Sequence, residues 1–183
     1  MMSYNPEAEE QGVYILSAFK DGMIDDALYL INKYSDNHSI WYTSKSTKWN
    51  WLHKILLSPS SNNYKASLSV KYLIDLGLDI NAQDIYGMTP LHYALRSGNA
   101  EAAIELLNAG ADPNIPNIDN LRPLSMAAYT KERSLEVLEL MLEKGGNVHN
   151  IINENETILQ SWTPQENSEQ WEIDIYNMMK KYS

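Results

Sequence analysis

The chain carries the stretch DIYGMTPLHYALRSGN at residues 84–99, and this stretch decides the fold. Gly87 can adopt the positive φ angle that closes a tight β-turn. Thr89 is a good N-cap residue, and Pro90 suits the first helical position, where its missing N–H leaves no hydrogen bond unmade. Gly98 can end the short helix as a left-handed C-cap. Residues 84–99 therefore predict a tight turn followed by a short helix.

A second helix is predicted directly after the first. Asn99 can cap its start, and Gly110 can end it. Between these two residues the apolar side chains fall on one helical face, formed by Ala103, Ile104, Leu106 and Leu107. Asp-Pro-Asn at residues 112–114 then opens the next turn. The local unit is thus a turn and two helices.

The same unit recurs along the chain. Downstream, LRPLSMAA at residues 121–128 repeats the pattern, with Pro123 in the place of Pro90. Upstream, NWLH at residues 50–53 matches the helix start, with Asn50 as the N-cap and Trp51 at the proline position. Repetition in register is typical of a solenoid built from stacked units.

The copies differ in length only locally. Trp51 and Pro90 are farther apart in sequence than Pro90 and Pro123. Gly77 and Gly110, which end successive second helices, are nevertheless separated by the same number of residues as Pro90 and Pro123. The six additional residues of the upstream copy therefore fall between its two helices, within the polar loop 58–63. The interval from Gly110 to Gly145 is slightly longer again, so the next copy carries about two additional residues near 129–133.

Two weaker copies flank these three. Residues 15–31 match helix, glycine and helix, and residues 156–162 match the start of a first helix, followed by a loop over 163–170 and a last helix over 171–181. The repeated unit resembles an ankyrin repeat, whose signature is Thr-Pro-Leu-His-x-Ala at a period of about 33 residues. Residues 89–94 carry that signature in full, and Pro123 follows Pro90 by one such period. Arg122, Trp51 and Ser125 depart from it at the Thr, Pro and His positions, which weakens individual caps.

The resemblance implies an all-α ankyrin-repeat solenoid of about five helix-turn-helix units with β-turn fingers, in one domain over residues 1–183. The outer two units act as caps, because an end unit buries only one face. The expected units are an N-cap unit at 8–37, a repeat with an inter-helix insertion at 38–80, the best-matched repeat at 81–113, a repeat at 114–148 and a C-cap unit at 149–183.

Composition excludes several classes. The 183 residues include 14 basic and 24 acidic side chains, for a formal net charge of −10, which disfavours nucleic acid as a partner. No cysteine is present, so disulfides and cysteine-bound zinc are excluded. No apolar run approaches the roughly 20 residues of a membrane-spanning helix, and the acidic residues 1–10 do not resemble a signal peptide. We expect a cytoplasmic protein that binds no membrane.

Neither a metal site nor a catalytic site is expected. In the family, the imidazole at the position of His53 and His92 hydrogen-bonds the neighbouring turn, and His38 and His149 fall at a turn position where side chains bond local backbone. No histidine pair has the i, i+4 spacing of a helical zinc site. No phosphate loop, nucleophile elbow or Ser/His/Asp arrangement is present. The sequence predicts no catalytic residue, no metal and no cofactor.

Binding of another protein is the remaining class. In ankyrin-like arrays the fingers and the exposed side of the first helices form one concave surface, and here the first finger is long, with 16 positions from Asp36 to Leu52. Trp, Tyr and Arg are enriched at interface hot spots. For Trp51 we expect packing, and for Trp41, Tyr86 and Tyr93 contact and packing are both open. The candidate contact residues are Trp41, Tyr42, Trp49, Asp84, Tyr86, Tyr93, Arg96, Asn117, Asp119, Met126 and Tyr129.

The function expected is therefore non-catalytic protein binding, by a protein that is a monomer when free. The narrower hypothesis is a small bacterial-type immunity protein, whose acidic surface steers it to a basic toxin or effector enzyme that it inhibits. One alternative is a pathogen effector or adaptor that docks onto a host protein. Another is an enzyme, or a regulatory subunit of one, with an unrecognised site. The apolar face of residues 171–179 either seals the last repeat or joins two copies.

Overall fold

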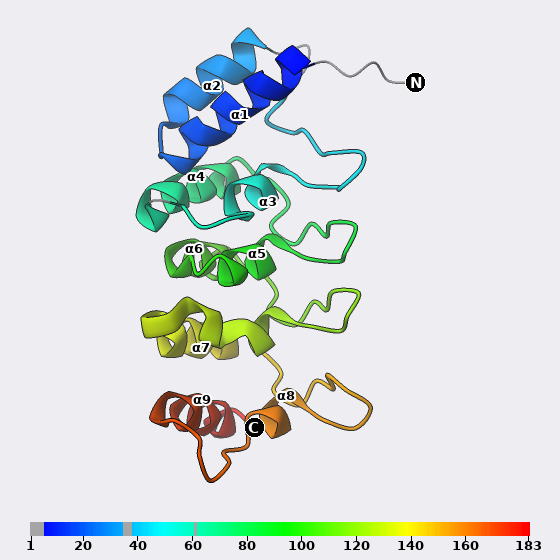
Figure 1. Ribbon diagram of the computed structural model, residues 1–183, viewed down its shortest axis with the longest axis vertical. Helices are drawn as coiled ribbons and strands as arrows, with labels where there is room; N and C mark the ends of the chain where they lie inside the picture. Colours follow the sequence, from blue (N-terminus) through cyan, green and yellow to red (C-terminus); the bar gives the residue numbers. More distant parts are fainter. Residues whose placement is uncertain (1–5, 35–37, 61) are drawn as a thin grey trace.

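The computed structural model describes residues 6–34, 38–60 and 62–183. Within these ranges ten helices follow one another in five pairs, stacked along one axis (Figure 1), and the described residues form no strand beyond an isolated bridge between Ile151 and Thr157. The expected all-α solenoid of stacked helix pairs is confirmed. The helices are α1 (Pro6–Lys20), α2 (Ile24–Lys33), α3 (Trp51–Leu56), α4 (Asn63–Asp75), α5 (Pro90–Arg96), α6 (Ala100–Asn108), η1 (Pro123–Arg133), α7 (Ser134–Glu143), α8 (Ile158–Ser161) and α9 (Gln170–Lys181).

The helix pairs follow the expected order of units, and the residue boundaries of the units stay predictions. Residues 1–5, which were expected to carry no signal peptide, and Asp36, from which the length of the first finger was measured, lie outside the described residues. So does Ser61 in the expected inter-helix loop. The described part of that loop separates α3 from α4, as the length difference between the copies predicts.

Polar capping pairs start the first helices of three units. In each pair the side chain three residues on accepts from the N-cap backbone N–H, and in the pairs that begin at Asn50 and Thr157 the N-cap side chain also accepts from the backbone N–H three residues on. These bonds satisfy backbone donors that a helix leaves free. The pairs are Asn50–His53, Thr89–His92 and Thr157–Gln160.

The turns between units project on one side of the stack as fingers (Figure 1). We define finger 1 as residues 38–50, finger 2 as 79–89, finger 3 as 112–122 and finger 4 as 147–157. Gly87 in finger 2 has the expected positive φ, +73°. A Cβ atom there would lie 3.0 Å from the Cα atom of Asn117, so this position also lets finger 3 pack directly against finger 2.

The apolar core runs through the whole stack. The residue after the proline position is fully buried in three successive units, as Leu52, Leu91 and Leu124, and Ile158, at the proline position of the fifth unit, is fully buried as well. Trp51, in place of the proline, is also fully buried, and its ring packs against Phe19 of α1 with centroids 5.5 Å apart. The expectation that Trp51 packs is confirmed. Truncating such a side chain to alanine costs about 3–5 kcal/mol.

Two buried histidines link neighbouring units. The Nε2 atom of His53 donates to the carbonyl of Met88 (3.2 Å), and Nε2 of His92 donates to the carbonyl of Leu121 (3.1 Å). The expected bond from each imidazole to the next turn is therefore confirmed. Ser125 takes the equivalent position in the fourth unit, where its buried hydroxyl oxygen has no hydrogen-bond partner among the described residues. The fourth and fifth units lack this link.

The asparagines of the turns connect units as well. The turn position of His149 is also that of Asn81 and Asn114, and the expectation that side chains there bond local backbone was wrong for these two asparagines. The Oδ1 atom of Asn81 accepts from the backbone N–H of Asp112 (3.0 Å), and Oδ1 of Asn114 accepts from that of Asn147 (2.8 Å). Each side chain thus joins its turn to the next turn along the stack. His149, at the following position of this row, is exposed.

Candidate functional site

The candidate surface consists of the four fingers and of α3, α5 and η1, the first helices that follow fingers 1 to 3. Figure 1 shows these segments on the same side of the stack, with the second helices behind them. The first helices α3 and α5 contain no acidic residue, whereas α2, α4, α6 and α7 each contain at least one. The first helices α3 and α5 therefore differ in charge from the second helices behind them.

The structure separates the eleven candidate contact residues by burial. Six are exposed and two are half-buried, while Asp84 (4% exposed), Tyr93 (2%) and Met126 (2%) are buried. Asp84, Tyr93 and Met126 are therefore not available for contact with a partner, because other residues of this chain already cover their side chains. The exposed six are Trp41, Tyr42, Tyr86, Arg96, Asp119 and Tyr129, and the half-buried two are Trp49 and Asn117.

Asp84 and Tyr93 instead belong to a hydrogen-bond network that joins the first two fingers to α5. The Tyr93 hydroxyl donates to Oδ2 of Asp84 (2.6 Å). The indole N–H of Trp49, from finger 1, reaches both Oδ2 of Asp84 (3.2 Å) and the Tyr93 hydroxyl (3.1 Å). Oδ1 of Asp84 accepts from the backbone N–H groups of Tyr86 and Met88, at 2.8 Å each. One carboxylate thus holds the turn of finger 2 and fastens finger 1 to it.

The titration behaviour of the two groups agrees with this structural role. Burial alone would raise the pKa of Asp84, but hydrogen bonds from Tyr93, Met88, Trp49 and Tyr86 outweigh it and lower that pKa. Burial raises the pKa of Tyr93 to about 12, together with its hydrogen bond to Asp84 and the charge of that carboxylate. The network therefore keeps a charged carboxylate and a neutral phenol at neutral pH.

Arg96 and Tyr129 remain as a pair of exposed candidates. The Arg96 guanidinium lies over the ring of Tyr93, 4.6 Å from its centroid, and takes part in none of the ion pairs found among the described residues. Arg96 and Tyr129 line one cavity of about 640 Å³. A stacked guanidinium keeps its N–H groups free for a carboxylate or a carbonyl of a partner.

Lys54 on α3 is a candidate that the sequence analysis missed. Its ammonium lies over the rings of Tyr42 (4.6 Å) and Trp51 (4.5 Å), and burial lowers its pKa. Lys54 follows Trp51 by three residues, as Tyr93 follows Pro90 and Met126 follows Pro123. Extending the comparison of equivalent positions to the second unit would have identified it.

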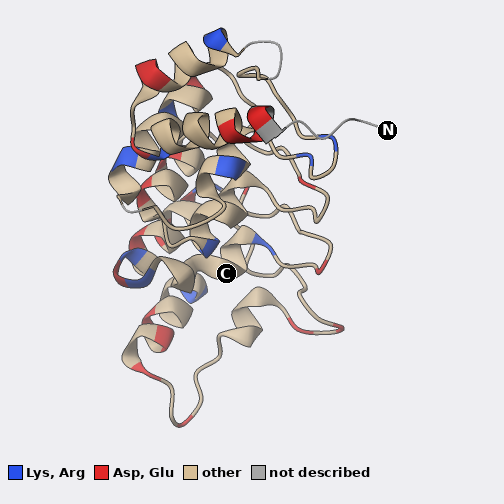
Figure 2. Cartoon of the chain, turned by 45° about the horizontal axis from the view of Figure 1, so that its top comes forward, with Lys and Arg blue, Asp and Glu red and all other residues tan. Residues whose placement is uncertain are grey.

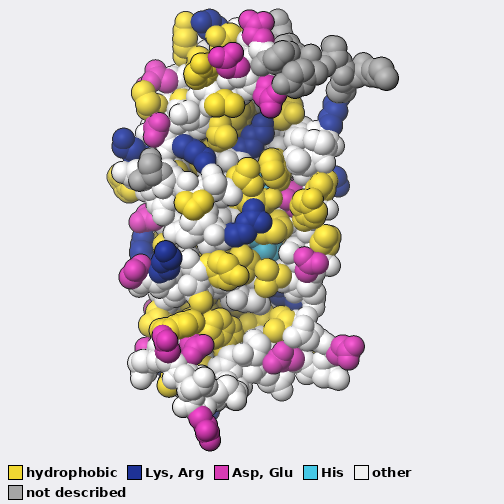
Figure 3. Space-filling model, in the orientation of Figure 1, with side chains coloured by type: hydrophobic (Ala, Val, Ile, Leu, Met, Phe, Trp, Pro, Cys, Tyr) yellow, Lys and Arg dark blue, Asp and Glu magenta, His cyan; other side chains and the backbone are white. Residues whose placement is uncertain are grey.

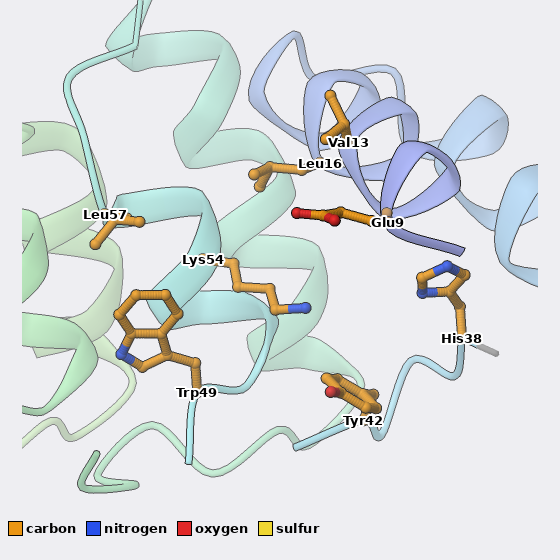
Figure 4. Close-up of a pocket in the computed structure, with 9 residues that line it drawn as sticks. Glu9, Val13, Leu16, His38, Tyr42, Trp49, Lys54 and Leu57 are labelled. Carbon is orange, nitrogen blue, oxygen red and sulfur yellow. The ribbon is translucent and has the colours of Figure 1, made fainter. Parts of the chain in front are cut away.

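A cavity of about 410 Å³ opens beside Lys54, between α1, finger 1 and α3. In Figure 4 Lys54 extends into it between Trp49 and Tyr42, and Glu9 reaches toward it from α1. Val13, Leu16 and Leu57 add apolar walls, and Gly12 and His38 complete the lining. The cavity thus combines aromatic, apolar and charged groups at the N-terminal end of the surface.

Charge changes sign along the fingers. Finger 1 contains Lys45 and Lys48 and no acidic residue. Fingers 3 and 4 contain four acidic residues, Asp112, Asp119, Glu154 and Glu156. The one basic residue in these two fingers, Arg122, donates to the carbonyls of Asn120 and Ile151. Figure 2 shows basic residues on the finger nearest the N-terminal end and acidic residues on the fingers nearest the C-terminal end.

Residues 6–34, 38–60 and 62–183 lack the features of two other kinds of site. In those ranges no three His, Cys, Asp or Glu side chains are grouped so that they could hold a metal ion. Nor does any helix there combine the length and the apolar character needed to cross a bilayer. The absence of catalysis, metal and cofactor stays a prediction from the sequence.

Comparisons with known proteins give short matches within much longer relatives. The chain is 35% identical over 82 residues to the ankyrin repeat protein FPV244 of Fowlpox virus (strain NVSL), a match that covers 45% of this chain and 12% of that protein. It is 39% identical over 70 residues to the ADP-ribosylation factor GTPase-activating protein AGD4 of Arabidopsis thaliana, covering 36% of this chain and 9% of that protein. With oxysterol-binding protein-related protein 1 of Homo sapiens it shares 43% over 49 residues, 27% of this chain and 5% of that protein.

The family comparison covers far more of the chain. The family described as Ankyrin repeats (3 copies) matches residues 15–117 and, in an overlapping alignment, residues 60–153. Together these matches extend from α1 to finger 4, through the first four helix pairs. The stacked helix pairs, the buried histidine links and the fingers are the structural counterpart of this match. The chain belongs to the ankyrin repeat family.

Proposed function

We propose that this chain binds another protein with its fingers and first helices, and that it catalyses no reaction itself. Ankyrin repeats are protein–protein interaction modules, which supports the class. The observation that carries the proposal is the set of exposed aromatic side chains on this surface, Trp41, Tyr86 and Tyr129. Large aromatic side chains that are not needed for the core are typical of interface hot spots.

Within this class we propose an immunity-like inhibitor that binds and neutralises a toxin or effector enzyme with a basic surface. The net charge of −10 supports this, because it would speed encounter with a basic protein. The exposed acidic residues Asp119 and Glu154 on fingers 3 and 4 would meet the basic partner first. The aromatic side chains would then supply most of the contact area.

Two sets of variants test the proposal with a partner co-purified from the native cell. The triple variant Trp41→Ala, Tyr86→Ala, Tyr129→Ala should bind at least about tenfold more weakly, because hot-spot aromatics dominate interface energy. The control is Tyr29→Ala, Tyr64→Ala, since these tyrosines on α2 and α4 are 64% and 63% exposed, at least as much as the three aromatic residues of the test variant. Equal binding by both sets would contradict the proposed surface.

The inhibitor hypothesis also predicts three properties of that partner. It should be basic, it should be toxic when produced alone, and its association rate should fall as salt rises. Asp119→Lys, Glu154→Lys should slow association, whereas the matched charge change Glu139→Lys, Glu143→Lys on α7 should slow it less. Association that is insensitive to salt would contradict electrostatic steering.

A second candidate function is an effector or adaptor that docks onto a host protein. The match to an ankyrin repeat protein of a virus favours it. The same aromatic surface would be used, so the triple variant does not separate the two candidates. The partner separates them, because an effector would bind a host protein and would give no protection against a toxin.

A further inference from the structure

Exposed isoleucines lie in three successive fingers. Ile85 and Ile118 occupy the same position, four residues before the N-cap of the following helix, and Ile151 lies two residues before that position in finger 4. Of their respective surfaces, 43%, 67% and 55% are exposed. Single exposed apolar residues are ordinary, but a row of them on neighbouring fingers marks an interaction surface. We call this row, with the charged residues of fingers 1 and 4, the finger edge.

Hydrogen bonds hold the fingers together as one row. The backbone N–H of Ile85 donates to the carbonyl of Thr47 in finger 1 (3.1 Å), and that of Ile118 donates to the carbonyl of Tyr86 in finger 2 (3.0 Å). The side-chain amide of Asn120 in finger 3 donates to the carbonyl of Ile151 in finger 4 (2.9 Å). The isoleucines are therefore presented on a connected support.

The finger edge carries exposed isoleucines in its middle, where the exposed Asp119 follows Ile118, and it is oppositely charged at its two ends. Lys45 and Lys48 lie at the finger 1 end, and Glu154 and Glu156 lie in finger 4. In the space-filling view of Figure 3 the right-hand edge shows dark blue atoms near the top, yellow atoms in the middle and magenta atoms below. Such a surface is complementary to itself when it is turned end for end.

We propose that the finger edge binds the finger edge of a second copy of this chain in antiparallel orientation, around a two-fold axis between fingers 2 and 3. A two-fold interface requires one surface to be self-complementary. Finger 1 of one copy then faces finger 4 of the other, so Lys45 and Lys48 meet Glu154 and Glu156. Finger 2 faces finger 3, which brings Ile85 against Ile118 at the centre. A parallel arrangement would oppose lysine to lysine and glutamate to glutamate.

The two kinds of contact have different roles. Exposed ion pairs contribute little affinity, so the isoleucines provide the attraction and the charges select the antiparallel orientation. The net charge of −10 on each copy opposes association at long range. At physiological salt the screening length is about 8 Å. Screening therefore weakens this long-range repulsion more than it weakens the attraction between oppositely charged side chains in contact. We therefore propose a dimer where the sequence analysis expected a free monomer. Formation of this dimer does not require the proposed partner.

Sedimentation of the full chain, from micromolar to millimolar concentration at physiological salt, tests the proposal. Wild type should show a monomer–dimer equilibrium. Ile118→Ser should raise the dissociation constant at least about tenfold, because the substitution enters the interface twice. Tyr64→Ser, which also removes a large exposed side chain but lies on α4, should leave it unchanged. Circular dichroism of each variant confirms that the fold is kept.

Charge reversal tests the orientation. Lys45→Glu, Lys48→Glu and Glu154→Lys, Glu156→Lys should each weaken self-association, and the two variants mixed should associate with each other. The matched controls Lys65→Glu, Lys144→Glu and Glu139→Lys, Glu143→Lys make the same changes in net charge away from the fingers, and should show no such exchange. A monomeric wild type, a dimer unaffected by Ile118→Ser, or charge variants that fail to associate when mixed would each overturn the proposal.

Discussion

The Asp84 carboxylate shows how a single residue can serve two fingers at once. It closes the turn of its own finger through backbone N–H groups, and it receives the Trp49 indole from the finger before it. Because the Tyr93 hydroxyl completes the set from α5, the carboxylate is satisfied although it is buried. This arrangement explains why Tyr93 is part of the framework.

Tyr93→Phe should therefore lower the free energy of unfolding by about 1–2 kcal/mol, because it removes the shortest hydrogen bond to a buried carboxylate and leaves the ring in place. Urea denaturation measures the change. Tyr86→Phe is the control, since the Tyr86 side chain is 54% exposed and should give no change. Equal effects of the two substitutions would show that the network contributes little.

His92 should make stability depend on pH. Burial lowers its pKa from 6.5 to about 4, and this outweighs the bond to Leu121 and the charge of Asp84, which raise it. Between these two pKa values the unfolded chain binds more protons than the folded chain. The contribution of neutral His92, about 3 kcal/mol, is fully present above pH 6.5 and is lost as the pH falls toward 4.

Urea midpoints from about pH 7 down to about pH 4 measure this dependence. His92→Gln should flatten the curve, because the variant has no imidazole to protonate at this position. His149→Gln, at an exposed position, should keep the wild-type curve. If His92→Gln and wild type lose stability in parallel, then other groups dominate the acid response: the carboxylates, or His53, whose pKa burial also lowers.

At the scale of the element, η1 departs most from its counterparts. It consists of two 3₁₀ segments joined by a kink at Lys131, which has φ 53° and ψ −118°, a conformation that favours glycine. The irregularity lies within residues 129–133, where the length of this unit predicts about two additional residues. The sequence therefore located the irregularity, but not the change of helix type.

Lys131→Gly should raise the free energy of unfolding by about 1 kcal/mol, because relief of the backbone strain exceeds the entropy that glycine adds to the unfolded chain. Thermal unfolding measures the shift. Glu132→Gly is the matched control at the residue after the kink, where φ is not positive, and it should destabilise by about 0.5–1 kcal/mol. Destabilisation by Lys131→Gly would show that η1 does not store strain there.

At the scale of the whole molecule, each unit contacts only its neighbours along the stack, so stability need not be uniform. His53 and His92 link the second, third and fourth units, whereas Ser125 leaves the fifth unit without such a link. The third unit is covered on both sides, and the fifth unit has a neighbour on one side only (Figure 1). The C-terminal pair should therefore open more often than the centre.

Native-state hydrogen exchange measures this difference. Amides of α6 should exchange more slowly than amides of α9, because α6 opens only when central contacts are lost. The two helices have similar lengths, 9 and 12 residues, so helix length does not create the contrast. Equal protection of both would mean that the stack opens as a single cooperative unit.

The architecture could be predicted because each repeat specifies its own local structure. Gly87, Thr89 and Pro90 determine a turn and a helix start from their own backbone preferences. The same local signals recur in register, so the stacking followed without knowledge of any distant contact.

The contact surface was less predictable, because it depends on contacts between distant residues. Tyr93 is covered by Trp49, 44 positions earlier, from a finger whose additional length breaks the repeat pattern. Lys54 was missed because the candidates in the second unit were sought only in its finger. The exposed positions of Trp41, Tyr86 and Tyr129 agree with the expected surface, and their role in binding stays a prediction.

The placement of the tryptophans gives this solenoid a built-in optical property. Trp41, Trp49 and Trp51 lie at the N-terminal end of the stack, and Trp162 and Trp171 pack together at the C-terminal end, with no tryptophan between residues 52 and 161. Indole fluorescence therefore reports on the two ends, while far-ultraviolet circular dichroism reports on every helix. The difference between the midpoints of the two melting curves then measures how far the ends unfold before the centre does.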